Sequence, residues 1–219
     1  MLSIKNIVRL LITLAIFYGI WLMVCLTIPY AKFDRYTDFL MTKQLVYHIK
    51  SWRVGFYVHV LVSTFVLIAG LLQFSKYLLY KHPRWHRNIG KVYVFIVLFA
   101  SGPGGLIMSF YANGGWPARV SFVILSCLWL YTTAMAWRYA LQRKWQPHIN
   151  MMIRSYALTL SALTLRFYAY MIDLLNIPIK PILAYIWIAW LSWTLNLIVA
   201  EVMIRYGPLR LEGTKVRQG

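Results

Sequence analysis

Long apolar runs, separated by short polar or basic stretches, dominate the hydrophobic pattern of this chain. A helix needs about 20 predominantly apolar residues to cross the hydrocarbon core of a bilayer. The pattern predicts six such helices, over approximately residues 7–30, 54–80, 89–111, 118–141, 152–175 and 182–205. Little of the chain lies outside these runs. The expected fold is therefore all-α, a six-transmembrane-helix bundle in which residues 1–219 form a single integral membrane domain.

The composition supports a membrane protein, because 61% of the 219 residues are hydrophobic and only 13% are charged. A soluble domain of this size has no use for so much apolar surface. The first run follows Lys5 and Arg9, and no good small-residue cleavage site comes after it, so we expect an uncleaved anchor. The two cysteines, Cys25 and Cys127, lie in apolar runs at different expected depths and form no metal or redox motif.

The net charge of +18 is explained by basic residues that flank the predicted helices, and it does not indicate a nucleic-acid partner. One side of the predicted bundle carries fifteen of them: Lys5, Arg9, Lys76, Lys81, Arg84, Arg87, Lys91, Arg138, Arg143, Lys144, Arg154, Arg205, Arg210, Lys215 and Arg217. The other side carries seven: Lys32, Arg35, Lys43, Lys50, Arg53, Arg119 and Lys180. The positive-inside rule then predicts that both termini are cytoplasmic. A basic cytoplasmic face also attracts anionic lipids.

Arg166 stands near the middle of an apolar run, over residues 151–175. An arginine at the centre of a membrane helix costs about 2.5–3.5 kcal/mol on insertion scales. The chain has five carboxylates, and none is expected at the depth of Arg166: Asp34, Asp38, Asp173, Glu201 and Glu212. The predicted partner of Arg166 is therefore a set of protein dipoles, water, or a bound ligand that carries an anionic or carbonyl group.

Polar residues recur at helical spacing on two predicted helices. His148, Ser155, Thr159, Arg166 and Asp173 fall within about 20° of one line on the fifth helix, if that helix extends back to His148. On the second helix, residues 59, 63, 70 and 73 fall within about 40° of one line; they are His59, Ser63, Gly70 and Gln73.

A kink is predicted in the third helix, where Ser101-Gly102-Pro103-Gly104-Gly105 removes a backbone donor and weakens the helix. Pro103 and Arg166 are expected at the same depth. Together with the two polar lines they predict a polar pocket near the bilayer centre, between the second, third and fifth helices. The alternative is a structural network, in which Arg166 binds carbonyl groups freed near Pro103.

Histidines offer candidate chemistry at one end of the predicted bundle. His86 and His148 are expected at the same depth on the third and fifth helices, where two imidazoles can hold a b-type haem. Arg154 and Arg87 are close enough in sequence to bind its propionates, and His59 and Gln73 are expected to line the cavity. The alternatives are a transition-metal site that also uses His82, or histidines that are merely interfacial.

Several motifs resemble those of a known family. They are His86-Arg87-Asn88-Ile89-Gly90, the segments 70–74 and 101–105, and Met152-Ile153-Arg154-Ser155-Tyr156-Ala157-Leu158-Thr159 followed by Thr164-Leu165-Arg166. Over residues 54–175 the chain resembles the bacterial multi-pass membrane proteins catalogued as domain of unknown function 2306. The resemblance implies a bacterial plasma (inner) membrane protein and implies no reaction. His148 matches a family histidine, whereas residues 149–151 depart from the basic residues and tryptophan usual there.

The leading functional hypothesis is a redox-linked integral membrane protein that binds haem b, a quinone, or both, in the polar intramembrane pocket. Arg166 would neutralise a haem propionate or polarise a quinone carbonyl through a charge-assisted hydrogen bond. One alternative is a non-enzymatic transporter or sensor of a small anion or amphiphile, for which a kinked helix and a central arginine serve equally well. Another is a structural or assembly protein without a ligand.

Overall fold

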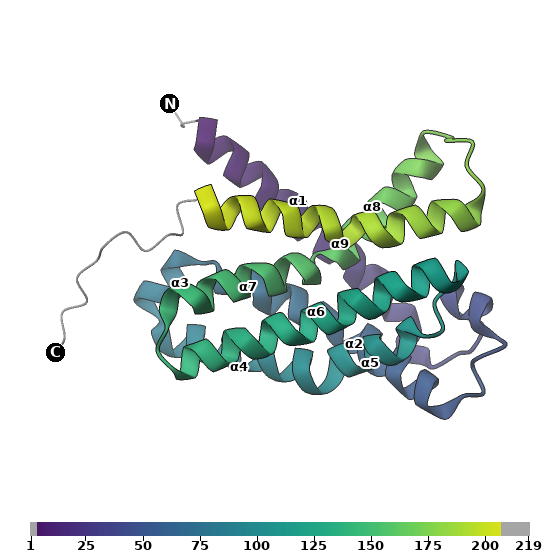
Figure 1. Cartoon of the computed structure of the whole chain (residues 1–219), viewed down its shortest axis with the longest axis horizontal. Coiled ribbons are helices and arrows are strands. Elements are labelled where there is room, and N and C mark those ends of the chain that lie inside the picture. Colours follow the sequence, from purple (N-terminus) through teal and green to yellow (C-terminus); the bar gives the residue numbers. More distant parts are fainter. Residues whose placement is uncertain (1–3, 207–219) are drawn as a thin grey trace. The chain divides into compact units, whose positions relative to one another are not determined.

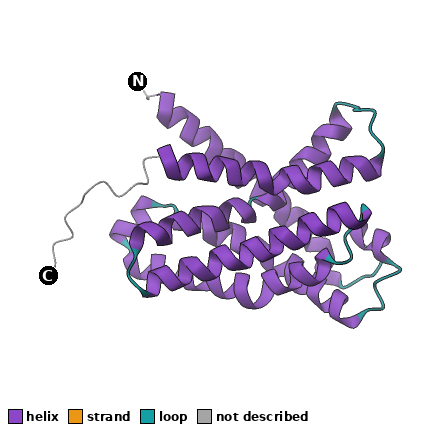
Figure 2. Cartoon of the chain, viewed as in Figure 1, coloured by secondary structure: helices purple, strands orange, loops and turns teal. Residues whose placement is uncertain are grey.

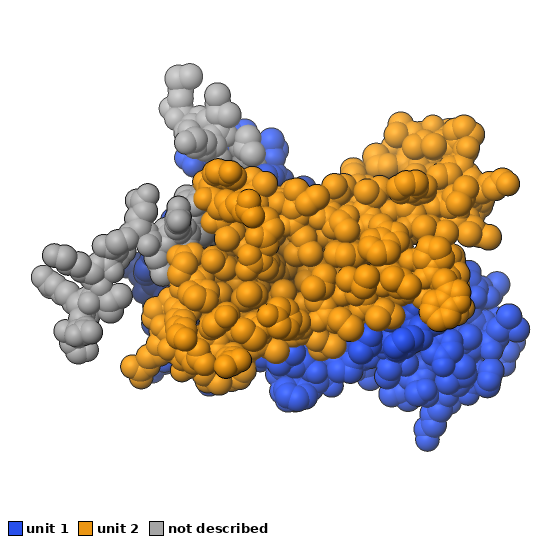
Figure 3. Space-filling model, viewed as in Figure 1, with its two compact units in different colours: residues 1–111 blue, residues 112–219 orange. Residues whose placement is uncertain are grey.

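The computed structural model describes residues 4–206, and every regular element in that range is a helix (Figure 2). The chain divides into two compact units, residues 1–111 and 112–219, which are described in turn (Figure 3). The prediction of one integral domain stays a prediction. Arg210, Lys215 and Arg217, which contributed to the predicted orientation, lie outside the described residues.

The first unit is built around α2. Its elements are α1 (Ile4–Thr27), the 3-10 turns η1 (Ile28–Lys32) and η2 (Asp38–Lys43), α2 (Lys50–Gln73), α3 (Lys76–Lys81), α4 (Pro83–Ile96), the π-helical turn η3 (Val97–Ser101) and α5 (Gly102–Ser109). α2 packs against α4, η3 and α5 (Figure 1). At the start of α2, Trp52 and Phe56 form an aromatic cluster with Tyr30 and Leu40 from the preceding turns.

The predicted second helix, over residues 54–80, is wrong in its extent, because α2 ends at Gln73. Ser75 caps the short α3 instead, since its Oγ accepts a hydrogen bond from the Leu78 amide at 3.2 Å. Pro83 then opens α4 at the first helical position, where its missing N–H is not needed. The third helix therefore begins six residues earlier than predicted, and His86 lies in its first turn.

A π-helical turn, η3, joins α4 to α5 directly before the segment 102–105, next to the place where a kink is predicted; the kink itself stays a prediction. The Gly102 amide binds the Val97 carbonyl, five residues back along the chain. Beyond this turn, α5 approaches α2 so closely that a Cβ atom on Gly104 would lie 2.6 Å from the Gly55 carbonyl oxygen. Glycine at position 104 therefore permits the contact between α2 and α5.

The second unit contains four helices: α6 (Gly115–Leu141), α7 (Trp145–Thr159), α8 (Ser161–Leu174) and α9 (Pro181–Tyr206). α6 and α7 lie side by side, and α9 packs against α6, α7 and α8 (Figure 1). Gly114 precedes α6 with φ of 83°, a left-handed conformation that favours glycine. A Cβ atom there would also lie 3.0 Å from the ring of Tyr185.

The predicted fifth helix, over residues 152–175, is broken at Leu160 into α7 and α8. No proline or glycine causes the break. Instead, side chains bind carbonyl groups around it: the Ser161 hydroxyl donates to the Leu158 carbonyl at 2.6 Å, and Asn196 Nδ2 donates to the Ala157 carbonyl at 3.1 Å. Side chains that insert into the backbone ladder bend helices. The extension of this helix back to His148 is confirmed, since α7 begins at Trp145.

Within residues 4–206, five helical stretches are long and apolar enough to cross a membrane. They are Leu10–Lys32, Lys50–Gln73, Pro83–Ser109, Gly115–Leu141 and Pro181–Tyr206. The predicted fifth helix, over residues 152–175, is not among them because Leu160 divides it into two shorter pieces. The all-helical, multi-pass architecture agrees with the sequence, whereas the count of six spanning helices and the orientation of the termini remain predictions.

Candidate functional site

His59, Ser63 and Ser101 form a hydrogen-bonded cluster in the first unit, between α2 and η3. His59 Nδ1 lies 2.7 Å from the Ser101 carbonyl oxygen, and the hydroxyl oxygens of Ser63 and Ser101 are 2.5 Å apart. The Ser63 hydroxyl also donates to the His59 carbonyl. Because a carbonyl oxygen only accepts, Nδ1 is the protonated nitrogen of the His59 ring. His59 in this cluster thus supplies a hydrogen-bond donor to a backbone carbonyl at the irregular turn. Arg166 was the residue considered for that role.

Gln73 and His86, two other predicted site residues, meet at the junction of α2 and α4. Gln73 Nε2 donates to the His86 carbonyl at 3.0 Å. A Cβ atom on Gly90 would lie 3.0 Å from Gln73 Oε1, so the glycine of the His-Arg-x-x-Gly motif makes room for this side chain. His59 lies fourteen residues before Gln73 on α2, about 20 Å away along the helix. The predicted site residues of this unit therefore fall in two separate places.

His148 is held at the start of α7 in the second unit. Its Nδ1 lies 2.9 Å from the Ala136 carbonyl oxygen of α6, and its ring meets Trp145 edge to face, with centroids 6.5 Å apart. The carbonyl acceptor again requires the proton on Nδ1, so Nε2 carries the lone pair. The half-buried ring thus has a fixed tautomer, which is the arrangement usual for a histidine that ligates a metal.

Arg154 is paired with a carboxylate of α9. Its Nε lies 2.5 Å from Glu201 Oε1 and its Nη2 lies 2.9 Å from Oε2, a two-point contact that joins α7 to α9. A haem propionate, the partner predicted for this charge, would have to compete with Glu201. Glu201 is the sole carboxylate of the last apolar run, which was the available signal for this pair.

The polar line predicted on the fifth helix divides at the break. On α7, Ser155 Oγ lies 2.7 Å from Thr133 Oγ1, and Thr159 Oγ1 accepts from Trp129 Nε1 at 3.0 Å, so both side chains are bound to α6. On α8, the Arg166 side chain is exposed, and its Nη1 donates to the Ala162 carbonyl of its own helix at 3.0 Å. Within this unit, Arg166 is therefore not gathered into one pocket with the polar side chains of α7.

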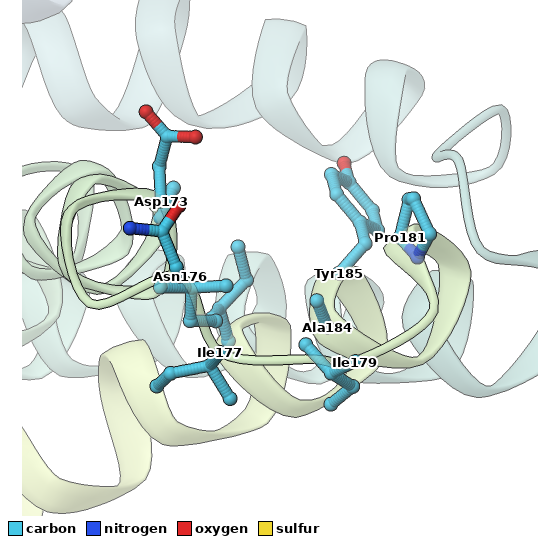
Figure 4. A pocket seen from close by; sticks show the side chains of 10 residues that line it. Asp173, Asn176, Ile177, Ile179, Pro181, Ala184 and Tyr185 are labelled. Atoms are coloured by element: carbon cyan, nitrogen blue, oxygen red, sulfur yellow. The ribbon is translucent and has the colours of Figure 1, made fainter.

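A pocket of about 480 Å³ opens between the last turn of α8 and the first turns of α9. Aliphatic side chains form most of its wall, and Asp173, Asn176 and Tyr185 are its polar residues. Figure 4 shows Asp173 and Asn176 on one side of the opening and Tyr185 and Pro181 on the other. Asp173 belongs to the predicted polar line, whereas the pocket has no signal in the sequence, because it depends on how α8 and α9 diverge.

Lys43 is a residue whose environment the sequence analysis missed. It was counted as a flanking basic residue, yet only 4% of its surface is exposed. Its Nζ donates to the Tyr111 carbonyl at 2.6 Å and lies 5.4 Å from the centre of the Phe39 ring. Buried in this way, Lys43 links the η2 turn to the end of the α5 segment.

Among residues 4–206, no group of three or more histidine, cysteine or acidic side chains is arranged to hold a metal ion. The three-histidine site draws its residues from both units, and it stays a prediction. His82 is exposed, and its Nε2 lies 3.3 Å from the Tyr77 hydroxyl.

Apolar helices of spanning length, with buried hydroxyl, histidine and ion-pair contacts between them, define an integral multi-pass helical membrane protein. The chain belongs to the family of predicted membrane proteins catalogued as domain of unknown function 2306, whose model matches residues 56–204. The match confirms the family resemblance and extends it through α9. No curated protein and no solved structure matches the chain.

Proposed function

We propose that the protein is a redox-linked component of a bacterial plasma membrane, with both termini cytoplasmic, and that it binds a b-type haem through His148 and His86. The anchoring of His148 is the observation that carries the proposal. Its Nδ1–H donates to the Ala136 carbonyl at 2.9 Å, which leaves Nε2 as the basic nitrogen. Metal-ligating histidines nearly always donate their other ring N–H in this manner, because the bond fixes the tautomer and raises the basicity of the ligand.

His86 is the proposed second ligand. It is half-buried in the first turn of α4, and its backbone carbonyl is held by Gln73. Since His86 belongs to one unit and His148 to the other, their pairing rests on the common depth expected from the sequence.

Arg87 is the better candidate for a propionate partner than Arg154. Arg154 is engaged by Glu201 through two nitrogen atoms. Arg87 follows His86 directly and is exposed, and among the described residues its side chain forms one hydrogen bond, a long contact of 3.4 Å from Nε to the Pro83 carbonyl. We therefore expect Arg87→Gln to weaken haem retention more than Arg154→Gln does, because haem propionates bind most strongly to a guanidinium that is not already paired.

The absorption spectrum of the purified protein tests this function. Protein from cells supplied with a haem precursor should show a sharp Soret band, and split visible bands should appear on reduction. His148→Ala and His86→Ala should each remove or shift these bands, whereas His48→Ala, a change outside the proposed site, should leave them intact. A colourless protein, or a spectrum that neither variant changes, would contradict the haem assignment.

A quinone is the second ligand that we propose, at Arg166. The side chain is exposed on α8, and a guanidinium carries five N–H donors. A quinone dissolved in the bilayer could accept one of these bonds through a carbonyl oxygen. Arg166→Ala should then abolish quinone binding and leave unfolding unchanged, whereas loss of expression and stability would indicate a structural role.

The discontinuous fifth helix favours one alternative function, the transport or sensing of a small anion or amphiphile. Broken membrane helices commonly line substrate sites in transporters. Uptake of a labelled substrate into proteoliposomes by a protein that lacks haem would support this alternative, and a haem spectrum that depends on His148 would count against it.

A further inference from the structure

The pocket between α8 and α9 has the size and the lining of a ligand site, and it is separate from the proposed haem ligands. Its volume of about 480 Å³ lies in the range usual for small-molecule sites. Ile172, Ile177 and Ile188 supply apolar wall, and the polar residues lie at the ends of the helices (Figure 4). An amphiphile with one polar end fits such a lining better than a fully polar solute does.

Asp173 determines which charge the polar end of the ligand should carry. Within residues 4–206, its carboxylate forms no ion pair, and no side-chain or backbone group donates a hydrogen bond to it. Glu201, the other acidic residue of this unit within the described part of the chain, is already neutralised by Arg154. An ionised carboxylate only accepts hydrogen bonds, so it selects a ligand that carries N–H donors or a positive charge.

Tyr185 and Asn176 suit the same ligand. The tyrosine ring stands across the opening from Asp173, and aromatic faces attract cations through their quadrupole (Figure 4). The side-chain carbonyl of Asn176 supplies a further acceptor. These groups and Asp173 all favour a cation over an anion.

Arg166 does not cancel this preference. It lies on α8 seven residues before Asp173, about 10 Å away along the helix axis. The bond from its Nη1 to the Ala162 carbonyl draws the guanidinium further toward the start of α8. The charge of Arg166 acts on Tyr185, but Arg166 and Asp173 form no ion pair in the described part of the chain, so the pocket is more negative at its Asp173 end.

We propose that this pocket binds a lipophilic cation, with its ammonium group beside Asp173 and its apolar body against the isoleucine side chains. Such a group reaches the site either on a free amphiphile or on an amine-bearing lipid headgroup. The proposal does not depend on haem, because every residue that it uses lies between positions 162 and 188.

Two shape-matched ions of opposite charge test the proposal. The full chain, in nanodiscs of phosphatidylcholine, is titrated with radiolabelled tetraphenylphosphonium and, separately, with tetraphenylborate. We expect saturable binding of the cation and no saturable binding of the anion. Asp173→Asn should weaken cation binding about tenfold, because the phosphonium loses its coulombic attraction to an ionised carboxylate, and Asp173→Glu should retain it. Asp38→Asn, which removes an acidic group of the other unit, should change nothing.

A second variant fills the pocket without changing any charge, so that its effect on binding can be separated from indirect effects of Asp173→Asn. Ala169 is exposed and lines the pocket, so Ala169→Trp should fill the space and abolish binding while all charges are kept. Equal affinity of the unmodified protein and the Asp173→Asn variant would overturn the proposal, as would saturable binding of the borate or undiminished binding in Ala169→Trp.

The two sources of the ammonium group are separated by adding phosphatidylethanolamine to the nanodiscs. Weaker phosphonium binding in those discs would identify the lipid headgroup as the occupant, whereas unchanged binding would identify a free amphiphile.

Discussion

The ion pair between Arg154 and Glu201 offers a direct measurement of how α7 is held to α9. Two parallel contacts, of 2.5 and 2.9 Å, give the fork geometry in which Arg–carboxylate pairs are strongest. The side chains are partly exposed, by 25% for Arg154 and 39% for Glu201, so the full cost of breaking a buried pair does not apply. Buried pairs lose about 3–5 kcal/mol when one partner is removed, and exposed pairs lose about 0–1 kcal/mol.

We expect Glu201→Gln to lower the free energy of unfolding by about 1–2 kcal/mol, between these limits. Arg154→Gln should do the same, and the double variant should cost little more than either single variant, because the second change removes a group that has already lost its partner. Unfolding of the protein in mixed micelles, followed by tryptophan fluorescence, measures all four proteins of this cycle.

The interaction energy from this cycle tests whether the Arg154–Glu201 ion pair holds α7 to α9. A coupling near zero, with the two single costs adding in the double variant, would show that the contact does not hold α7 to α9. Arg138→Gln is the matched control, since this exposed residue of α6 forms no ion pair among the described residues.

Three further outcomes are expected. Gly104→Ala should destabilise the protein by about 1–3 kcal/mol in the same unfolding assay, because the added Cβ would meet the Gly55 carbonyl at 2.6 Å; unchanged stability would exclude this close contact. Asn196→Leu should cost about 1 kcal/mol, since the Ala157 carbonyl loses its side-chain donor, and a neutral effect would show that water or lipid replaces it. A phosphatase fused after Gly219 should be inactive, and periplasmic activity would reverse the predicted orientation.

Local pattern was enough to predict the class of this protein. Apolar runs of spanning length predict helices wherever they occur, because each membrane helix satisfies its own backbone hydrogen bonds. The run 101–105 predicts an irregular third helix through the residues that it contains, since proline removes a donor and glycine weakens the ladder. Motifs such as His86-Arg87-Asn88-Ile89-Gly90 identified the family for the same reason, as each is contiguous in the sequence.

Contacts between distant residues were decided only by the tertiary structure. No proline or glycine marks the break at Leu160, and one of the side chains that bind carbonyl groups around it is Asn196 of the distant α9, on the Ala157 carbonyl. The partner of Arg154 is 47 residues away, and the burial of Lys43 depends on the Tyr111 carbonyl, 68 residues further on. Side-chain spacing predicts which residues share a helix face. It does not predict which neighbouring helix meets that face, because that choice depends on packing between segments that are remote in the sequence.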